Sequence, residues 1–545
     1  MLKQLTSNWF ASRRTAQLLG VAWVSLLLLR LSVLGKGAFG SYDEGRYLQS
    51  FSALRAVAHG DWRGCAYALS MTDARPLDAL WRCVPAAGQL ALSHWAGYSI
   101  YTYPSLLLPT ALNWARTVLT AWFFFAICRQ LLRQHVASLQ WSLVAAILYA
   151  GLVNTSLEVR HVSPYDGALL LFMGLLYWVL RQPAATSAWF WLKLGLGAGA
   201  IWLVYPGYYA APVLLVAPLL SWRAPLAWVR GHFPHVLLLG AGFATPLLAA
   251  EALSRYGGGP PFWAISYDLS LHILQGDPNE GYTFLFAYLW QVENALGFVL
   301  LLLLALAVGQ KLQSLRTEGL AAIIPHTALQ KLLLAALLLF LLHATAAAGW
   351  HRIVWYGRLL RLYMPFLVLA GVAALGAVRW QLAASWLALS SCLVAVVSYL
   401  LFLVAYARIV YPSDISGAYK LSCIPEDRLL YFNEVKTADK LLYRVHSARV
   451  APVANCPSVS GDSLTILVNF ALLYPLMEAS HRELPSFGPA VRVLLDAPLN
   501  RSFPAYEFEG LRPAERAEAR RRQFRLRILR VEALPATNIN GLLLR

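Results

Sequence analysis

Charged residues are scarce in this sequence: Asp, Glu, Lys and Arg make up 13% of its 545 residues. Soluble globular domains use about 25%. Here 59% of the residues are hydrophobic, and the mean hydropathy is +0.54. The chain cannot surround itself with a charged surface, so the class of soluble globular proteins is excluded. The composition indicates a polytopic membrane protein.

Apolar runs long enough to cross roughly 30 Å of hydrocarbon recur along the first three quarters of the chain. They predict about eleven transmembrane helices, and so an all-α membrane domain over 1–406. The expected helices lie at about 15–35, 107–131, 137–154, 164–181, 187–204, 208–222, 233–252, 286–309, 330–349, 360–379 and 383–406. No small-residue cleavage site follows the first of them, so we expect it to be a retained anchor rather than a signal peptide.

Acidic residues are nearly absent from every second connection, where Glu318 is the exception. Cations concentrate there instead, which places these connections and the amino terminus in the cytoplasm. The loops 36–106 and 252–285, and everything after about 407, are then outside. The same bias accounts for much of the net charge of +18, so a nucleic-acid partner is not needed to explain it. The cations are Lys3, Arg13, Arg14, Arg129, Arg133, Arg181, Lys193, Arg223, Arg230, Lys311, Arg316, Lys331 and Arg379.

Cysteines are few, and four of the six fall on the predicted outer side. Cys65 and Cys83 share the first outer loop, and Cys423 and Cys456 share the carboxy-terminal region. Because that side is oxidising, we predict the disulfides Cys65–Cys83 and Cys423–Cys456. Free thiols remain the alternative.

Residues 407–545 have the length of one ordinary domain, predicted as an outer soluble domain. The stretch "EVKTADKLLYRV" is typical of a helix, and "QFRLRILRVEAL" alternates as a strand does, so an α/β or α+β domain is expected. The run "SLTILVNFALLYPLM" at 463–477 is short for a membrane span and favours core. If it were a twelfth span instead, the arginine-rich stretch at 515–530 would be cytoplasmic.

Polar residues gather at the predicted outer ends of the helices. Charged groups at a membrane boundary are costly unless they are paired or hydrated, so their convergence predicts a functional site. Any one of them could instead be an interfacial anchor or half of a salt bridge, but this alternative explains the whole set less well. The candidates are Asp43, Glu44, Arg46, Arg160, His161, Tyr165, Asp166, Tyr205, Tyr208, Asp268, His272, Tyr356, Arg358 and Arg361.

The chemistry of this set favours glycosyl transfer. Arg358 and Arg361 are one helical turn apart and present forked donors suited to phosphate oxygens. The aspartates could accept a proton from a hydroxyl or hold a divalent cation, and the tyrosines suit a sugar face. We expect no metal and no required cofactor, because no tight His/Asp cluster occurs; a divalent cation remains an open alternative.

Two short motifs resemble a known family. "SYDEGRYL" follows the first helix, and Asp166 in "SPYDG" opens the fourth. Together they resemble the GT-C class of polyprenyl-phosphate-dependent glycosyltransferases. Within it, "DEGRY" is similar to the "DEARY"-like motif of bacterial lipid A aminoarabinose transferases and protein O-mannosyltransferases, with Gly45 where Ala is usual. The resemblance covers the first seven or so helices and the arginine-rich entry to the tenth.

The resemblance implies a role for each matching residue. Asp43 would be the general base, Glu44 would be structural or tune it, and Asp166 would orient the acceptor or donor. Arg358 and Arg361 would contact the lipid phosphate, and the reaction would invert the anomeric centre. It further implies a multi-pass protein of the bacterial cytoplasmic (inner) membrane with its active site on the periplasmic or extracellular side.

The expected function is transfer of a single sugar from a polyprenyl-phosphate donor to lipid A, an envelope polysaccharide or a secreted protein such as a pilin. The main alternative is a transporter or flippase of lipid-linked sugar. Such proteins show internal repeats and helices broken near mid-membrane, and neither is evident in the sequence. A non-catalytic scaffold is a second alternative, but it would not need acids, arginines and tyrosines on one rim.

Overall fold

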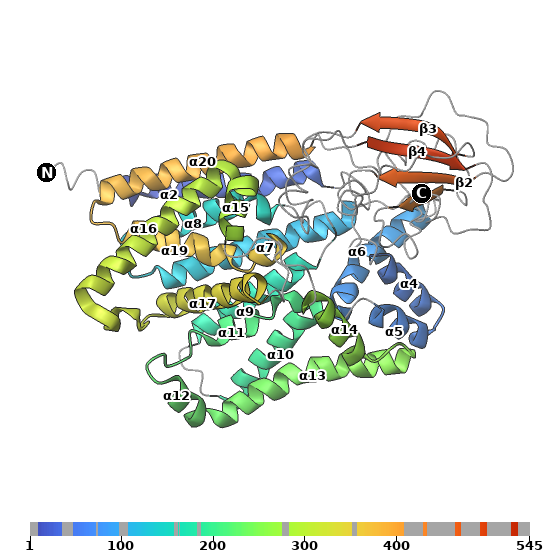
Figure 1. The fold of residues 1–545 in the computed structure, drawn as a ribbon, viewed down its shortest axis with the longest axis horizontal. Helices are drawn as coiled ribbons and strands as arrows, with labels where there is room; N and C mark the ends of the chain where they lie inside the picture. Colours follow the sequence, from blue (N-terminus) through green and yellow to red (C-terminus); the bar gives the residue numbers. More distant parts are fainter. Residues whose placement is uncertain are drawn as a thin grey trace.

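The structure is a computed structural model of a helical bundle followed by a β-sheet (Figure 1). It describes residues 9–34, 47–71, 75–96, 107–156, 162, 164–182, 187–274, 283–350, 357–407, 429–432, 464–469, 491–498 and 525–531. The predicted site residues Asp43, Glu44, Arg46, Arg160, His161 and Tyr356 lie outside these ranges, as do Cys423 and Cys456.

Every predicted span contains a helix. Six segments of the described chain are long and apolar enough to cross a membrane, namely 13–33, 107–131, 233–257, 284–318, 328–348 and 381–404. The helices in the predicted ranges are α2 (Arg13–Leu29), α7 (Leu107–Leu131), α8 (Ser138–Gly151), α9 (Tyr165–Arg181), α10 (Ala188–Val204), α11 (Ala211–Val216), α13 (Phe233–Gly257), α16 (Asn294–Glu318), α17 (Ala328–Ala348), α19 (Met364–Gly376) and α20 (Gln381–Ala407).

Local capping begins several of these helices where the sequence provides it. Ser12 accepts a hydrogen bond from the backbone N–H of Thr15 at the start of α2. Thr327 and Gln330 form a reciprocal capping box at the start of α17. Such caps satisfy backbone N–H groups that have no partner within the helix.

Two predicted spans depart from regular helices. The range 208–222 is wrong as a continuous span: it holds the end of a 3-10 turn, η4 (Pro206–Tyr208), and the six residues of α11. Pro206 and Pro212 lie in the first turns of η4 and α11, where proline is tolerated, and α11 ends at Val216, shortly before Pro218. The range 286–309 is also broken, because α15 (Phe284–Tyr288) passes into the π-helix η6 (Leu289–Glu293) before α16 begins.

The outer loop 36–106, predicted only as a loop, contains three helices. They are α4 (Tyr47–Ala58), α5 (Trp62–Ser70) and α6 (Pro76–Trp95). The loop 252–285 likewise contains α14 (Phe262–Leu274). The short helices α12 (Pro225–Gly231) and α18 (Gly357–Leu360) complete the bundle. In Figure 1, α4, α5 and α6 lie at the same end of the long axis as the sheet, whereas the connection from α16 to α17 lies at the opposite end.

The sheet has four strands in the order β1-β2-β4-β3. They are β1 (Leu429–Phe432), β2 (Leu464–Asn469), β3 (Val491–Pro498) and β4 (Arg525–Val531). β1 and β2 are parallel, and β4 pairs antiparallel with both β2 and β3. β2 falls within 463–477 and forms its first part, while residues 470–477 lie outside the described residues. β4 falls within "QFRLRILRVEAL", which confirms the strand predicted from its alternation. The helix expected at "EVKTADKLLYRV" lies outside the described residues.

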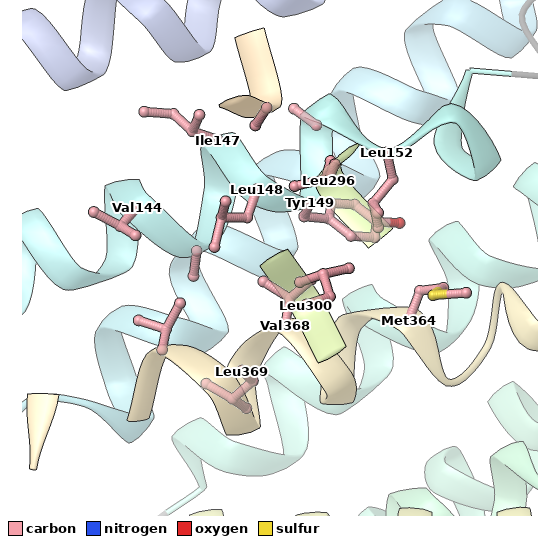
Figure 2. Close-up of a cluster of buried hydrophobic side chains, with 14 of the residues drawn as sticks. Val144, Ile147, Leu148, Tyr149, Leu152, Leu296, Leu300, Met364, Val368 and Leu369 are labelled. Carbon is pink, nitrogen blue, oxygen red and sulfur yellow. The ribbon is translucent and has the colours of Figure 1, made fainter. Parts of the chain in front are cut away.

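The central helix of the bundle is α8, whose residues from Gln140 to Gly151 are all buried. Figure 2 shows its side chains packed against Leu296 and Leu300 of α16 and against Met364, Val368 and Leu369 of α19. A helix that is apolar on all sides is expected to be enclosed by others. At its end, a Cβ on Gly151 would lie 2.8 Å from the Cβ of Ala395, so α20 packs closely there. This packing fixes the start of the 3-10 turn η2 (Val153–Thr155).

Candidate active site

Asp166 is the centre of a buried polar network. It stands in the first turn of α9, where the helix dipole favours a carboxylate, and it is only 1% exposed. Its Oδ1 forms an ion pair with Arg361, and its Oδ2 accepts a hydrogen bond from Thr117 Oγ1 at 3.2 Å. The structure thus brings together two residues that the sequence analysis had selected separately.

Thr155 joins Arg361 to a second buried arginine. The Thr155 carbonyl accepts from Arg361 Nη2 at 3.3 Å, and its hydroxyl accepts from Arg30 Nη2 at 2.8 Å. Arg30 Nη2 also donates to the Ala150 carbonyl at 2.6 Å, and its guanidinium lies 5.5 Å from the centre of the Tyr399 ring. Two buried cations therefore converge on one short turn.

Glu293 binds the same turn from α16's side of the bundle. Its carboxylate accepts the backbone N–H of Val153 at 2.7 Å and that of Asn154 at 2.9 Å. The side-chain amide of Asn154 donates to the Tyr288 hydroxyl at 2.6 Å and to the Gly357 carbonyl at 3.0 Å. The turn η2 is thus held by Arg30, Tyr288, Glu293, Gly357 and Arg361.

Arg116 adds a third buried guanidinium. Its Nη1 donates to Asn113 Oδ1 at 3.2 Å, and its cation lies 4.7 Å from the centre of the Trp81 ring. Its Nε and Nη2 are buried and, among the described residues, have no hydrogen-bond partner. Buried N–H groups of a cation are costly to leave unbound. They are suited to the oxygens of an anion.

The helix α6, in the first outer loop, contributes an ion pair beside this group. Arg82 Nη2 lies 2.6 Å from Asp78 Oδ2, and both side chains are buried. Arg82 Nη1 also donates to the Val162 carbonyl at 2.8 Å. Because Val162 lies between η2 and α9, this bond ties the outer-loop helix to the segment that precedes Asp166.

The predicted tyrosines also come together. The rings of Tyr165 and Tyr205 are 4.5 Å apart, and those of Tyr205 and Tyr208 are 5.2 Å apart, both edge to face. Arg75 lies over the Tyr205 ring at 5.1 Å. The three rings are buried, so they form a packed wall that joins the start of α9 to η4.

Three other predicted site residues have no described contact with the network around Asp166. Asp268 lies exposed on α14, and no described contact joins it to Asp166. His272 falls in α14 and Arg358 in α18 by the course of the backbone. The roles expected for these three residues, and for those outside the described ranges, remain predictions.

Sequence reasoning missed much of the network because it collected residues from loops. Arg30, Arg116 and Glu293 lie inside the predicted spans 15–35, 107–131 and 286–309. An ionisable residue within an apolar span is itself an indication of a functional position. Applying this rule to the spans would have selected all three. Asp78 and Arg82, which are four residues apart on α6, would have required recognising that helix.

Cys65 and Cys83 are free thiols in the structure. Both pack against one small cluster formed by Ala53, Ala68, Leu69 and Ala79. Burial raises the pKa of each thiol, and the neighbouring Cys65 adds to the rise at Cys83. Their shared surroundings are compatible with oxidation, and the disulfide remains a prediction.

No protein-family model matches this sequence, and no curated protein matches it. Two solved structures share its fold, both of ArnT from Cupriavidus metallidurans. The apo structure has a TM-score of 0.53 and 13% identity, covering 97% of this chain and 100% of that one. The structure bound to undecaprenyl phosphate has a TM-score of 0.50 and 12% identity, covering 95% and 99%.

The likeness to ArnT concerns the fold alone, since the sequences are only 12% and 13% identical. It extends over nearly the whole of both chains. The predicted fold class is confirmed: this is a multi-pass membrane protein with an ArnT-like fold.

Proposed function

We propose that this protein is an integral membrane glycosyltransferase that moves a single sugar from a polyprenyl-phosphate donor to an acceptor. The observation that carries the proposal is the buried pair of Asp166 and Arg361, beside Arg116. It occurs in the fold of ArnT, of which one structure holds undecaprenyl phosphate. Charged groups buried in a membrane domain at such a cost are expected to serve function.

The charge of the region supports a phosphate ligand. Five arginines are buried here, against three carboxylates, Asp78, Asp166 and Glu293, among the described residues. The arginines are Arg30, Arg75, Arg82, Arg116 and Arg361. The unpartnered N–H groups of Arg116 suit the phosphate oxygens of the donor, with Arg358 and Arg361 as further contacts. As the sugar leaves, these cations would stabilise the negative charge that grows on the phosphate.

The proposed reaction is one displacement. An acceptor hydroxyl or amine attacks the anomeric carbon, and the carbon–oxygen bond to the phosphate breaks. The phosphate leaves with the bonding electrons, and Asp43 takes the acceptor's proton. Asp166, held by Arg361 and Thr117, orients the substrates, and the Tyr165, Tyr205 and Tyr208 wall borders the sugar. The step inverts the anomeric centre and uses no cofactor.

The proposed location is a bacterial cytoplasmic membrane, with the active site and the carboxy-terminal domain on the outer side. The distribution of cations among alternate connections supports this orientation. The acceptor would be lipid A, an envelope polysaccharide or a secreted protein such as a pilin.

The deciding experiment gives the purified protein a polyprenyl-phosphate sugar and each acceptor class, and follows products by mass spectrometry. We expect a glycosylated acceptor and free polyprenyl phosphate in equal amounts, and the assay with and without EDTA tests for a divalent cation. Movement of the intact donor across a vesicle membrane, with no product, would favour a lipid-linked sugar flippase instead. Comparing envelope glycans with and without the gene identifies the acceptor.

A further inference from the structure

Glu293 has no part in the proposed chemistry, yet it is among the most deeply buried charged residues, at 1% exposure. Burying a carboxylate is expensive unless hydrogen bonds and nearby cations compensate for its lost hydration. A hydroxyl or carbonyl could satisfy a single backbone N–H at far lower cost. The presence of a charged group at this position therefore requires an explanation.

The two oxygens of Glu293 match two adjacent donors. α8 ends at Gly151, and the first N–H groups of η2 have no partner within the turn, as at the start of any helix. Glu293 Oε2 binds the N–H of Val153 at 2.7 Å, and Oε1 binds that of Asn154 at 2.9 Å. The carboxylate thereby fixes both the position and the orientation of the turn.

The chain around Glu293 departs from a regular helix to place it there. Glu293 ends the π-helix η6, and Asn294 follows with φ +51° and ψ −122°, a left-handed conformation rare for a residue other than glycine. Gly297 then packs so closely that a Cβ would lie 1.9 Å from the Leu289 carbonyl oxygen. Strained backbone of this kind persists where the surrounding structure requires it, and π-helical segments are frequent at functional sites.

The turn that Glu293 holds leads directly to the candidate active site. The carbonyl of Thr155, the last residue of η2, binds Arg361, which pairs with Asp166. Arg30 binds the same threonine. Around Thr155 there are therefore two buried carboxyl groups, of Asp166 and Glu293, and two buried guanidinium groups, of Arg30 and Arg361. A change at Glu293 that weakens its two hydrogen bonds would let η2 shift, and with it the Thr155 carbonyl that binds Arg361.

We propose that Glu293 is a positioning residue, which holds η2 so that the Thr155 carbonyl sets Arg361 against Asp166. This inference rests on the proposed glycosyltransferase function and assigns to Glu293 no contact with substrate. Glu293→Gln retains one acceptor oxygen but turns an amide NH₂ toward a backbone N–H. We expect it to lower kcat by up to about a hundredfold, as small misplacements of catalytic groups do. The KM for the acceptor should change little.

The test is a double-mutant cycle on full-length protein in detergent or nanodiscs, combining Glu293→Gln with Arg361→Lys. If Glu293 acts through Arg361, the double variant should be scarcely slower than Arg361→Lys alone, because coupled residues are not additive. The matched control is Glu251→Gln, since Glu251 is also a buried carboxylate that accepts a backbone N–H, from Trp263. Glu251→Gln should lower kcat by the same factor in the wild-type protein and in Arg361→Lys.

If Glu293→Gln lowers kcat by the same factor in the wild-type protein and in Arg361→Lys, the inference is overturned. A lower folded fraction alone would give that result, because it reduces the activity of both proteins equally. Wild-type kcat in Glu293→Gln would overturn it as well. If Glu293→Gln does not fold, Tyr288→Phe replaces it in the cycle, since it removes a hydrogen bond to Asn154 and spares the carboxylate. A wild-type protein without transferase activity would instead refute the proposed function itself.

Discussion

Arg361 binds the carboxylate of Asp166 across 195 positions of sequence, with both side chains buried in the membrane domain. Neither group can take its countercharge from water there. Each therefore depends on the other, and on Thr117 and Thr155, for the contacts that make its burial tolerable. The pair joins the start of α9 to the approach to α19, and it places a fixed charge distribution at the proposed reaction centre.

Breaking this pair should cost both stability and activity, in separable ways. Asp166→Asn leaves the Arg361 guanidinium buried without its countercharge, which typically costs about 3–5 kcal/mol. We expect a lower thermal unfolding temperature and no measurable transfer. The double variant Asp166→Asn with Arg361→Gln should recover stability and remain inactive. Activity in the stable double variant would contradict the role given to Asp166.

Asp43 is assigned as the general base from its place in "SYDEGRYL". Asp43→Asn should insert and fold normally but lose transfer by roughly two orders of magnitude or more, because the acceptor's proton then has no base. Turnover by purified protein checks this, with Glu44→Gln as the neighbouring control, expected to be milder. Near-normal turnover by Asp43→Asn would refute the assignment.

Replacing either of the two arginines before α19, Arg358 or Arg361, by lysine should weaken binding of the donor phosphate. A single ammonium replaces a forked guanidinium poorly at phosphate. Arg358→Lys should therefore raise the KM for the polyprenyl-phosphate sugar by the equivalent of about 1–3 kcal/mol, with less effect on the acceptor. Steady-state kinetics with each substrate varied separately measures this. If Arg358→Lys and Arg361→Lys both leave donor kinetics unchanged, the phosphate site lies elsewhere.

Cys65 and Cys83 should resist alkylation in unreduced protein from an oxidising compartment. After reduction both should react, but more slowly than a free cysteine at neutral pH. Burial raises their pKa, so less of the reactive thiolate is present, and the rate should climb at higher pH than for an ordinary thiol. Cys128 and Cys392 are buried in the bundle and serve as internal controls, since their labelling should be the same before and after reduction. Full labelling of Cys65 and Cys83 before reduction would exclude their disulfide.

Gly297 should be intolerant of a side chain. A Cβ there would lie 1.9 Å from the Leu289 carbonyl oxygen, which is too close for any rotamer to relieve. Gly297→Ala should lower expression and thermal stability, and move Glu293 away from η2. Gly309→Ala is the matched control in the same helix, since nothing lies within 4 Å of its Cβ position. Equal stability of the two variants would argue against the close packing at the break.

Sequence patterns that depend on neighbouring residues gave correct predictions. The apolar runs located the membrane helices, because a span must be apolar over its own length whatever it packs against. Alternation located β4, and the part of 463–477 that the structure describes is the strand β2. Asp166 and Arg361 were selected because charge is conspicuous in apolar surroundings. The helices of the loop 36–106 were missed although α5 and α6 are amphipathic, because a search for runs that are apolar over their whole length passes over helices with one polar face.

By itself, then, the sequence determined that this protein lies in a membrane, the approximate places of its long apolar helices, and a set of ionisable residues that are too costly to bury without a function. Only the tertiary structure decided which of them meet. The pairing of Asp166 with Arg361 and the binding of η2 by Glu293 join residues more than a hundred positions apart. Such contacts follow from how whole helices pack, and a π-helical break like that before α16 is stable only within that packing. The local periodicity of the sequence predicts neither the long-range contacts nor the π-helical break.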